Sequence, residues 1–192
     1  MVSTTLLQMD VRVRLTATDI IGWSIIDIVK NNPKSLTVYF GGKNGRRIRD
    51  TYLAMKVEIM HPDGTRSVEP ILKDLDPEAD SYTFTGPTGL LFSTQFAQPA
   101  LTVMEKATFA DLQSKGFVQD EARYAGHSLG EYSALASLSN FMTIESLVSV
   151  SFYRGLTMQA SMERDNEGRT DYSMIAINPS KVMKGKLTNI RI

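Results

Sequence analysis

The spacing of apolar residues predicts short elements in the first half of the chain and longer amphipathic helices in the second. Before residue 20 the apolar residues occur in short groups broken by charged ones, and they follow no sustained period. Residues 24–29 are rich in aliphatic side chains and predict a short helix. The Asn31-Asn32-Pro33 sequence ends it, because proline disfavours helical geometry in the residue before it.

A strand is predicted over residues 36–40, and the glycine-rich residues 41–45 that follow it predict a loop. Arg46, Arg47 and Arg49 come next and form a basic cluster. Such a cluster can hold a phosphate group, but it also suits a solvated loop face. Of these two interpretations we favour the solvated face.

Turn residues are frequent between residues 36 and 85, which predicts a β-rich segment. Residues 56–60 and 66–72 flank the sequence His-Pro-Asp-Gly-Thr at 61–65, whose composition is typical of a hairpin turn. Residues 81–84 predict one more strand, which the following Gly-Pro pair ends. We therefore expect a hairpin and additional strands in this part of the chain.

A long helix is predicted downstream of residue 91, where the character of the chain changes. Pro99 suits the first turn of this helix, because a missing N–H costs nothing there. A helical stripe of apolar residues follows, and Lys115 with Gly116 suits the C-terminal end. The stripe consists of Ala100, Val103, Met104, Ala107 and Ala110.

Strands and helices are predicted to alternate in the rest of the chain. Residues 123–125 predict a short buried strand, and residues 131–139 predict a helix rich in alanine and serine. Thr143 is a suitable N-cap for another helix, whose stripe begins at Ile144, and residues 174–177 predict a second core strand. This alternation is typical of parallel βαβ units. The predicted fold class is therefore α/β, with a three-layer core and an inserted hairpin region.

Composition narrows the possible classes of function. Hydrophobic residues make up 42% of the 192 residues and charged residues 22%, as in an ordinary globular domain. The 21 basic residues balance the 21 acidic ones, so no net charge favours nucleic acid or an anionic membrane. The chain has no cysteine, which excludes disulfides, thiolate metal sites and cysteine nucleophiles. We expect a cytoplasmic protein.

The sequence Gly126-His127-Ser128-Leu129-Gly130 has the pattern G-x-S-x-G between a predicted strand and a predicted helix. This is the context of a nucleophile elbow, in which glycines allow a sharp turn that presents the serine hydroxyl at the start of a helix. An oxyanion formed on an attacked thioester can then accept a hydrogen bond from the amide of Leu129. The alternative is a glycine-rich turn without chemistry. The strand–turn–helix context favours the nucleophile.

Three segments carry a resemblance to a known family. Residues 126–134 (GHSLGEYSA) resemble the active-site sequence of malonyl and acyl transferases of fatty acid and polyketide synthesis. Residues 94–101 (TQFAQPAL) are similar to their upstream segment, and residues 152–159 (FYRGLTMQ) to their downstream segment. Their order and spacing make the resemblance more specific than the serine motif alone. The β-rich segment, with Phe40-Gly41-Gly42 and the arginine cluster, resembles that of the fungal-type fatty acid synthase β subunit.

The resemblance implies a malonyl/palmitoyl transferase that moves acyl groups between coenzyme A and acyl carrier protein through a serine ester. Ser128 would be the acylated nucleophile. Arg154 would hold the free carboxylate of a malonyl group, a task suited to a planar, permanently charged donor. Without the resemblance, Arg154 would be interpreted as part of a surface ion pair. His127 and Gln98 would contribute to the substrate pocket. His127 is badly placed to act as the base because it adjoins Ser128, and Gln98 equally suits the start of a helix.

The implied architecture is a partial parallel-sheet acyltransferase core, similar to that of α/β-hydrolases, with residues 36–85 as a β-rich insertion. The resemblance covers residues 22–182 and leaves an unmatched N-terminal segment, 1–21, and an unmatched tail, 183–192. The implied partners are acyl carrier protein, coenzyme A thioesters and the other fatty acid synthase subunits. Nucleic acid, membrane, metal and cofactor are not expected.

Two parts of the family pattern have no counterpart in the sequence. One is the N-terminal glycine- and glutamine-rich strand end that supplies an oxyanion amide. The other is the general-base histidine, since no histidine follows His127 and His61 lies in the predicted hairpin turn. A serine hydroxyl is a weak nucleophile without a base. We therefore expect a fragment of the domain that has almost no activity alone. Two alternatives stay open: an esterase or thioesterase of the α/β-hydrolase type, and a non-catalytic truncated subunit.

Overall fold

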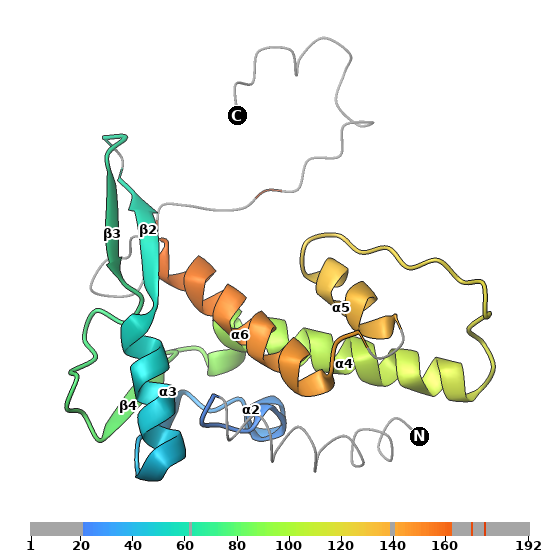
Figure 1. Ribbon diagram of the computed structural model, residues 1–192, viewed down its shortest axis with the longest axis horizontal. Coiled ribbons are helices and arrows are strands. Elements are labelled where there is room, and N and C mark those ends of the chain that lie inside the picture. Colours follow the sequence, from blue (N-terminus) through green and yellow to red (C-terminus); the bar gives the residue numbers. More distant parts are fainter. Residues whose placement is uncertain (1–20, 62, 139–140, 163–169, 171–174, 176–192) are drawn as a thin grey trace. The chain divides into compact units, whose positions relative to one another are not determined.

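The computed structural model describes residues 21–61, 63–138, 141–162, 170 and 175. The helices and strands below all belong to the first of two compact units, which ends at Ser161 (Figure 1). In chain order they are α2 (Ile25–Asn31), β1 (Ser35–Tyr39), α3 (Gly42–Ala54), β2 (Lys56–Met60), β3 (Arg66–Pro70), β4 (Ser81–Thr85), the 3-10 turn η1 (Leu90–Phe92), α4 (Thr94–Ser114), α5 (Leu129–Ser137) and α6 (Ile144–Ala160).

The predicted N-terminal helix is confirmed as α2. Ser24 caps it by accepting a hydrogen bond from the Asp27 amide. Asn32 ends it in the left-handed conformation, with φ at 38°, and Pro33 follows. The predicted strand after it is confirmed as β1.

The loop predicted over residues 41–45 is wrong, because these residues begin helix α3. The buried residues of α3 are Gly45, Ile48 and Tyr52, which recur at helical spacing and face the core. Gly45 fits because a Cβ there would lie 2.4 Å from the carbonyl carbon of Phe40. Arg46 and Arg47 lie on the exposed side of the same helix, whereas Arg49 is partly buried. The predicted solvated face therefore holds for two of the three arginines, and it lies on a helix and not on a loop.

Both sheets of the described residues are antiparallel pairs. Strands β2 and β3 form the predicted hairpin, with Lys56 opposite Pro70 and Met60 opposite Arg66. Strand β4 pairs with β1, far from it in sequence, and the hydroxyls of Thr37 and Thr83 lie 2.9 Å apart across this pair. The fold is thus mixed α and β with small antiparallel sheets, and no parallel strand pair occurs among the described residues.

The strand predicted over residues 123–125 does not form in the described part of the chain. These residues pair with no other strand, and Arg123 and Ala125 are exposed. A strand needs a neighbour to satisfy its backbone hydrogen bonds, and the described residues supply none. The strand predicted over residues 174–177 lies outside the described residues, apart from Ile175.

Helix α4 starts earlier than predicted. It begins at Thr94 and not near Pro99, which therefore lies inside the helix as a buried residue. Its end is as predicted, with Lys115 as the C-cap and Gly116 at a φ of +74°. Of the predicted stripe, Val103 and Ala107 are buried, but Met104 is exposed. None of the helices in the described ranges is long and apolar enough to cross a lipid bilayer.

An aromatic cluster joins Trp23, just before α2, to β4, α4 and α6 in one core. Trp23 packs against Phe96 and Phe152 with ring centroids 5.1 and 5.3 Å apart, and Phe84 lies 5.5 Å from Phe96. Helix α6 lies along α4 (Figure 1). Gly155 permits this close approach, since a Cβ there would lie 2.6 Å from Gln95 Cα. The core thus fixes α6 against α4, and these two helices carry the residues described next.

Candidate active site

The G-x-S-x-G sequence forms a sharp turn that leads into helix α5. Ser128 is the N-cap of α5 and adopts φ 54° and ψ −108°, a conformation that L-residues rarely adopt. The Gly130 amide donates to the His127 carbonyl at 3.0 Å, and the Glu131 amide to the Ser128 carbonyl at 3.3 Å. The side chain of Ser128 caps no amide of its own helix and is exposed, so its hydroxyl is presented at the tip of the turn.

The two glycines of the motif have different roles. A Cβ on Gly126 would lie 2.0 Å from the carbonyl carbon and oxygen of Gly130 and 2.4 Å from the Glu131 amide nitrogen. A Cβ on Gly130 would meet nothing within 4 Å. Glycine is therefore required at position 126, where the chain before Ser128 passes close to residues 130–131, but not at position 130.

Arg154 connects Ser128 to helix α4. Its Nη2 donates to Ser128 Oγ at 2.8 Å, and its Nη1 donates to Gln98 Oε1 at 2.7 Å. Its guanidinium carbon lies 5.6 Å from the centroid of the Tyr132 ring, which places the cation over an aromatic face. A guanidinium stays protonated at any physiological pH. Ser128 therefore has a permanent cation at hydrogen-bonding distance.

Gln98 holds Arg154 from a buried position. Only 6% of Gln98 is exposed, and its Nε2 donates to Thr94 Oγ1 at 2.9 Å and to Met158 Sδ at 3.3 Å. Because the amide nitrogen is occupied on both sides, the amide oxygen is directed at Arg154. A buried amide with fixed partners has little freedom to rotate, so it limits where the guanidinium can lie.

The structure thus brings together three of the residues predicted from the sequence, Ser128, Arg154 and Gln98. Leu129 is the first residue of α5, and amides in the first turn of a helix have no partner within the helix. The role of this amide as an oxyanion donor stays a prediction. The side chain of His127 is exposed, and no hydrogen bond joins it to Ser128 among the described residues.

No histidine side chain is hydrogen-bonded to Ser128 in the described part of the chain. The second histidine of the sequence, His61, lies at the end of strand β2, where its Nε2 is 2.9 Å from Ser67 Oγ. The partner of Ser128 is instead Arg154, which can stabilise negative charge but cannot accept a proton. The described residues therefore hold the Ser128 hydroxyl and a cation together, with no histidine side chain bonded to them.

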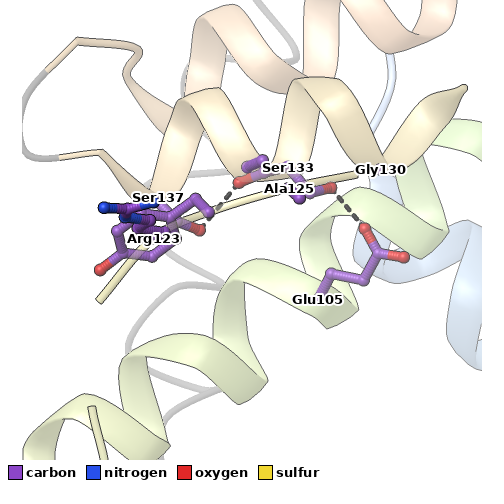
Figure 2. Close-up of a pocket in the computed structure, with 8 residues that line it drawn as sticks. Glu105, Arg123, Ala125, Gly130, Ser133 and Ser137 are labelled. Carbon is purple, nitrogen blue, oxygen red and sulfur yellow. Dashed lines mark hydrogen bonds between the residues drawn. The ribbon is translucent and has the colours of Figure 1, made fainter. Parts of the chain in front are cut away.

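Helix α5 packs on helix α4 through polar side chains (Figure 2). Ser133 Oγ donates a hydrogen bond to Glu105 Oε2, and Lys106 Nζ donates to the carbonyl of Ala136. Burial lowers the pKa of Lys106. A depression of about 350 Å³ lies between these helices and the extended residues 123–125.

Several residues of this site were not predicted from the sequence. Thr94, Met158 and Tyr132 lie within the three segments that carry the family resemblance, so their segments were identified but their roles were not. Glu105 lies outside those segments and has the appearance of an ordinary exposed helix residue. Its role depends on a contact with Ser133, which no sequence period indicates.

Comparison with known proteins gives a consistent result. The family model of the acyl transferase domain matches residues 12–189. The chain is 57% identical to the fatty acid synthase subunit beta of Saccharomyces cerevisiae over 164 residues, which is 85% of this chain and 8% of that protein. It is 55% identical to the subunit of Aspergillus oryzae over 163 residues and 54% identical to that of Schizosaccharomyces pombe over 161 residues. The chain thus spans less than a tenth of the length of these relatives.

Proposed function

The chain belongs to the family of acyl transferase domains, and from this premise we propose that it transfers a carboxylate-bearing acyl group through an ester on Ser128. The observation that carries the proposal is the pair of hydrogen bonds from Arg154 to Ser128 and to Gln98. They hold a cation next to the nucleophile. In a malonyl group a single methylene separates the free carboxylate from the thioester carbonyl, so a cation in this position suits a short diacid.

The proposed reaction has two steps. In the first, Ser128 Oγ attacks the carbonyl carbon of malonyl-coenzyme A and its proton passes to a base. The carbon–sulfur bond then breaks, coenzyme A leaves as the protonated thiol, and the acyl group remains as an ester. In the second, the phosphopantetheine thiol of an acyl carrier protein attacks this ester and restores the hydroxyl. The Leu129 amide stabilises the oxyanion in both steps, and acyl exchange between oxygen and sulfur requires no cofactor.

The partners and the finer fold form part of the same proposal. The relatives are named as fatty acid synthase beta subunits, and we assign this chain the same setting, with acyl carrier protein as the acceptor. We also propose that the extended residues 123–125 pair as a strand of a parallel sheet in a chain of the relatives' length. This proposal is supported by the lack of a strand partner for residues 123–125 among the described residues.

The test measures acylation of the chain itself. The 192-residue chain is incubated with radiolabelled malonyl-coenzyme A and acyl carrier protein, with and without added imidazole as a substitute base. We expect label on Ser128, located by peptide mass spectrometry, and label on the carrier, with imidazole increasing both. Ser128→Ala should carry no label. Release of free malonate alone would favour the hydrolase alternative, and the absence of any product would favour a non-catalytic subunit.

Arg154 tests the choice of acyl group. Arg154→Ala should slow malonyl transfer by about a hundredfold. Without a fixed cation, nothing compensates the loss of hydration of the malonyl carboxylate in the site. It should keep most of its palmitoyl transfer. The matched control is Arg66→Ala, which removes an exposed guanidinium that pairs with Glu58 on the hairpin. If both acyl groups are affected equally by Arg154→Ala but not by the control, Arg154 has a structural role and the specificity proposal is wrong.

A further inference from the structure

Helix α5, which carries Ser128 at its N-terminal end, has little apolar contact of its own. It is nine residues long, and Ala136 is its one buried residue. Isolated helices of this length are marginal in water, so contacts with the rest of the protein must hold it in place. In the described residues α5 contacts α4 and α6. Its position therefore depends strongly on a few polar contacts.

Two neighbouring residues of α4 supply such contacts. Glu105 accepts a hydrogen bond from Ser133 in the middle of α5, as Figure 2 shows. Lys106 donates to the Ala136 carbonyl, near the C-terminal end of α5, where a cation also complements the helix dipole. Lys106 lies 5.4 Å from the centroid of Phe109, and the Phe109 ring lies 5.6 Å from that of Tyr124. Helix α4 thus contacts both α5, which follows the turn at Ser128, and Tyr124, which precedes this turn.

The other partner of Ser128 is fixed to the same helix. Arg154 is held by Gln98, which belongs to α4. The distance between Ser128 and the Arg154 guanidinium therefore depends on connections to α4, through Gln98 for Arg154 and through Glu105 and Lys106 for α5. We propose that Glu105 is a positioning residue that acts through Ser133 to keep Ser128 at hydrogen-bonding distance from Arg154. This inference rests on the proposed acylation of Ser128.

A small movement of α5 is enough to break this geometry. Five residues separate Ser128 from Ser133, which corresponds to about 8 Å along a helix at about 1.5 Å per residue. A tilt of about 10° about Ser133 displaces Ser128 by about 1 Å over that length. A hydrogen bond does not survive a lengthening of about 1 Å, and a misplacement of about 1 Å can slow a reaction by about a hundredfold.

The experiment compares five variants of the full chain. They are Glu105→Ala, Glu105→Gln, Ser133→Ala, the double variant that combines Glu105→Ala with Ser133→Ala, and Asp111→Ala. Asp111 is the matched control, since it is another carboxylate of α4 but pairs with Lys115 of the same helix at 2.6 Å. Ser128 acylation by malonyl-coenzyme A is followed in imidazole as a function of thioester concentration. A fluorophosphonate, which reacts with an accessible serine without recognising malonyl, is the second probe. Hydrogen exchange of the amides of residues 129–137 reports on α5.

We expect Glu105→Ala to lower the maximal acylation rate about tenfold or more, with little change in the concentration of half-maximal rate. Ser133→Ala should have the same effect, and the double variant should add little to either. Glu105→Gln keeps an acceptor and should stay within about threefold of the parent chain. Exchange should rise in α5 alone, and Asp111→Ala should change nothing.

Three results would overturn the proposal: single-variant effects that add fully in the double variant, failure of Glu105→Gln to restore the rate, or faster exchange in α5 without a change in Ser128 reactivity. If malonyl-coenzyme A acylates no form of the chain, the proposed function fails. The fluorophosphonate rates then decide the positioning role separately, since a fall with Glu105→Ala but not with Asp111→Ala supports it, and equal rates contradict it.

Discussion

Gly126→Ala is the substitution whose effect the structure predicts most directly. The added Cβ would lie 2.0 Å from the Gly130 carbonyl carbon and oxygen. Both are backbone atoms, so no flexible side chain can move out of the way. Contacts of a real Cβ essentially never fall below 3.0 Å, so the chain on one side of Ser128 must move by at least 1 Å. The chain before the elbow can move away from α4, or the first turn of α5 can unwind.

Either movement should lower the free energy of unfolding and slow the acylation of Ser128. Overpacking of this kind typically destabilises a protein by about 1–3 kcal/mol. For a chain of this size, about 1 kcal/mol corresponds to about 2–4 °C in Tm, so we expect Tm to fall by about 2–12 °C. Both movements also displace Ser128 from Arg154, so its acylation should fall by about a hundredfold.

Gly130→Ala is the matched control, because it makes the same chemical change four residues further along. Its Cβ would meet nothing within 4 Å, and alanine is the better helix former by up to about 1 kcal/mol. Tm should therefore stay the same or rise by a few degrees. Circular dichroism during heating measures both variants. Equal Tm values for the two alanine variants would refute the reasoning from close approach, and so would an unchanged rate of Ser128 acylation in Gly126→Ala.

Three further predictions concern the core. Tyr52→Phe removes the buried hydroxyl that donates to the Ile21 carbonyl at 2.9 Å, and it should lower the free energy of unfolding by about 1–3 kcal/mol in urea titrations. Gly155→Ala places a Cβ 2.6 Å from the backbone of α4, so it should destabilise the chain by about 1–3 kcal/mol and slow Ser128 acylation as α6 moves. Burial raises the pKa of Tyr52, Tyr82 and Tyr153, so the folded chain keeps their protons above about pH 10, where the unfolded chain loses them. The contribution of these tyrosines to the free energy of unfolding should therefore be fully present below about pH 10 and decrease as the pH rises further. A constant Tm from pH 8 to 11 would contradict this.

Local signals in the sequence predicted those elements that local forces determine. Thr143 was predicted as an N-cap from the sequence, and it accepts a hydrogen bond from the Ser146 amide of its own helix. Ser24 caps α2 in the same way, although this cap was not predicted from the sequence. The turn chemistry of residues 61–65 gives the antiparallel hairpin, and the amides of Gly64 and Thr65 bond to His61 and Asp63. The loop predicted over residues 41–45 was wrong because glycine content was given more weight than periodicity. Gly45, Ile48 and Tyr52 already have helical spacing.

Non-local contacts explain the remaining differences. A strand is defined by its partner, and residues 123–125 find none within the described residues, although their sequence suits one. The pairing of β1 with β4 joins segments 46 residues apart, which no local pattern indicates. The same is true of the bond between Gln98 and Arg154, 56 residues apart. The family resemblance identified both residues as part of one pocket, but not that they touch.

In the proposed reaction, recognition of the acyl group and activation of Ser128 depend on different groups. The proposed recognition rests on a connected set of hydrogen bonds, which join Thr94 to Gln98, Gln98 to Arg154, and Arg154 to Ser128. Activation requires a proton acceptor, and in the described part of the chain neither histidine is hydrogen-bonded to Ser128. The His127 side chain is exposed, and His61 Nε2 lies 2.9 Å from Ser67 Oγ on the hairpin. The hydrogen bond from Arg154 favours negative charge on Ser128 Oγ but leaves the hydroxyl proton in place. Because Ser128 is exposed, an acceptor from outside this set of residues can reach it. The affinity for a carboxylate-bearing acyl group should therefore depend on Arg154, whereas the rate of ester formation should depend on the base that is supplied.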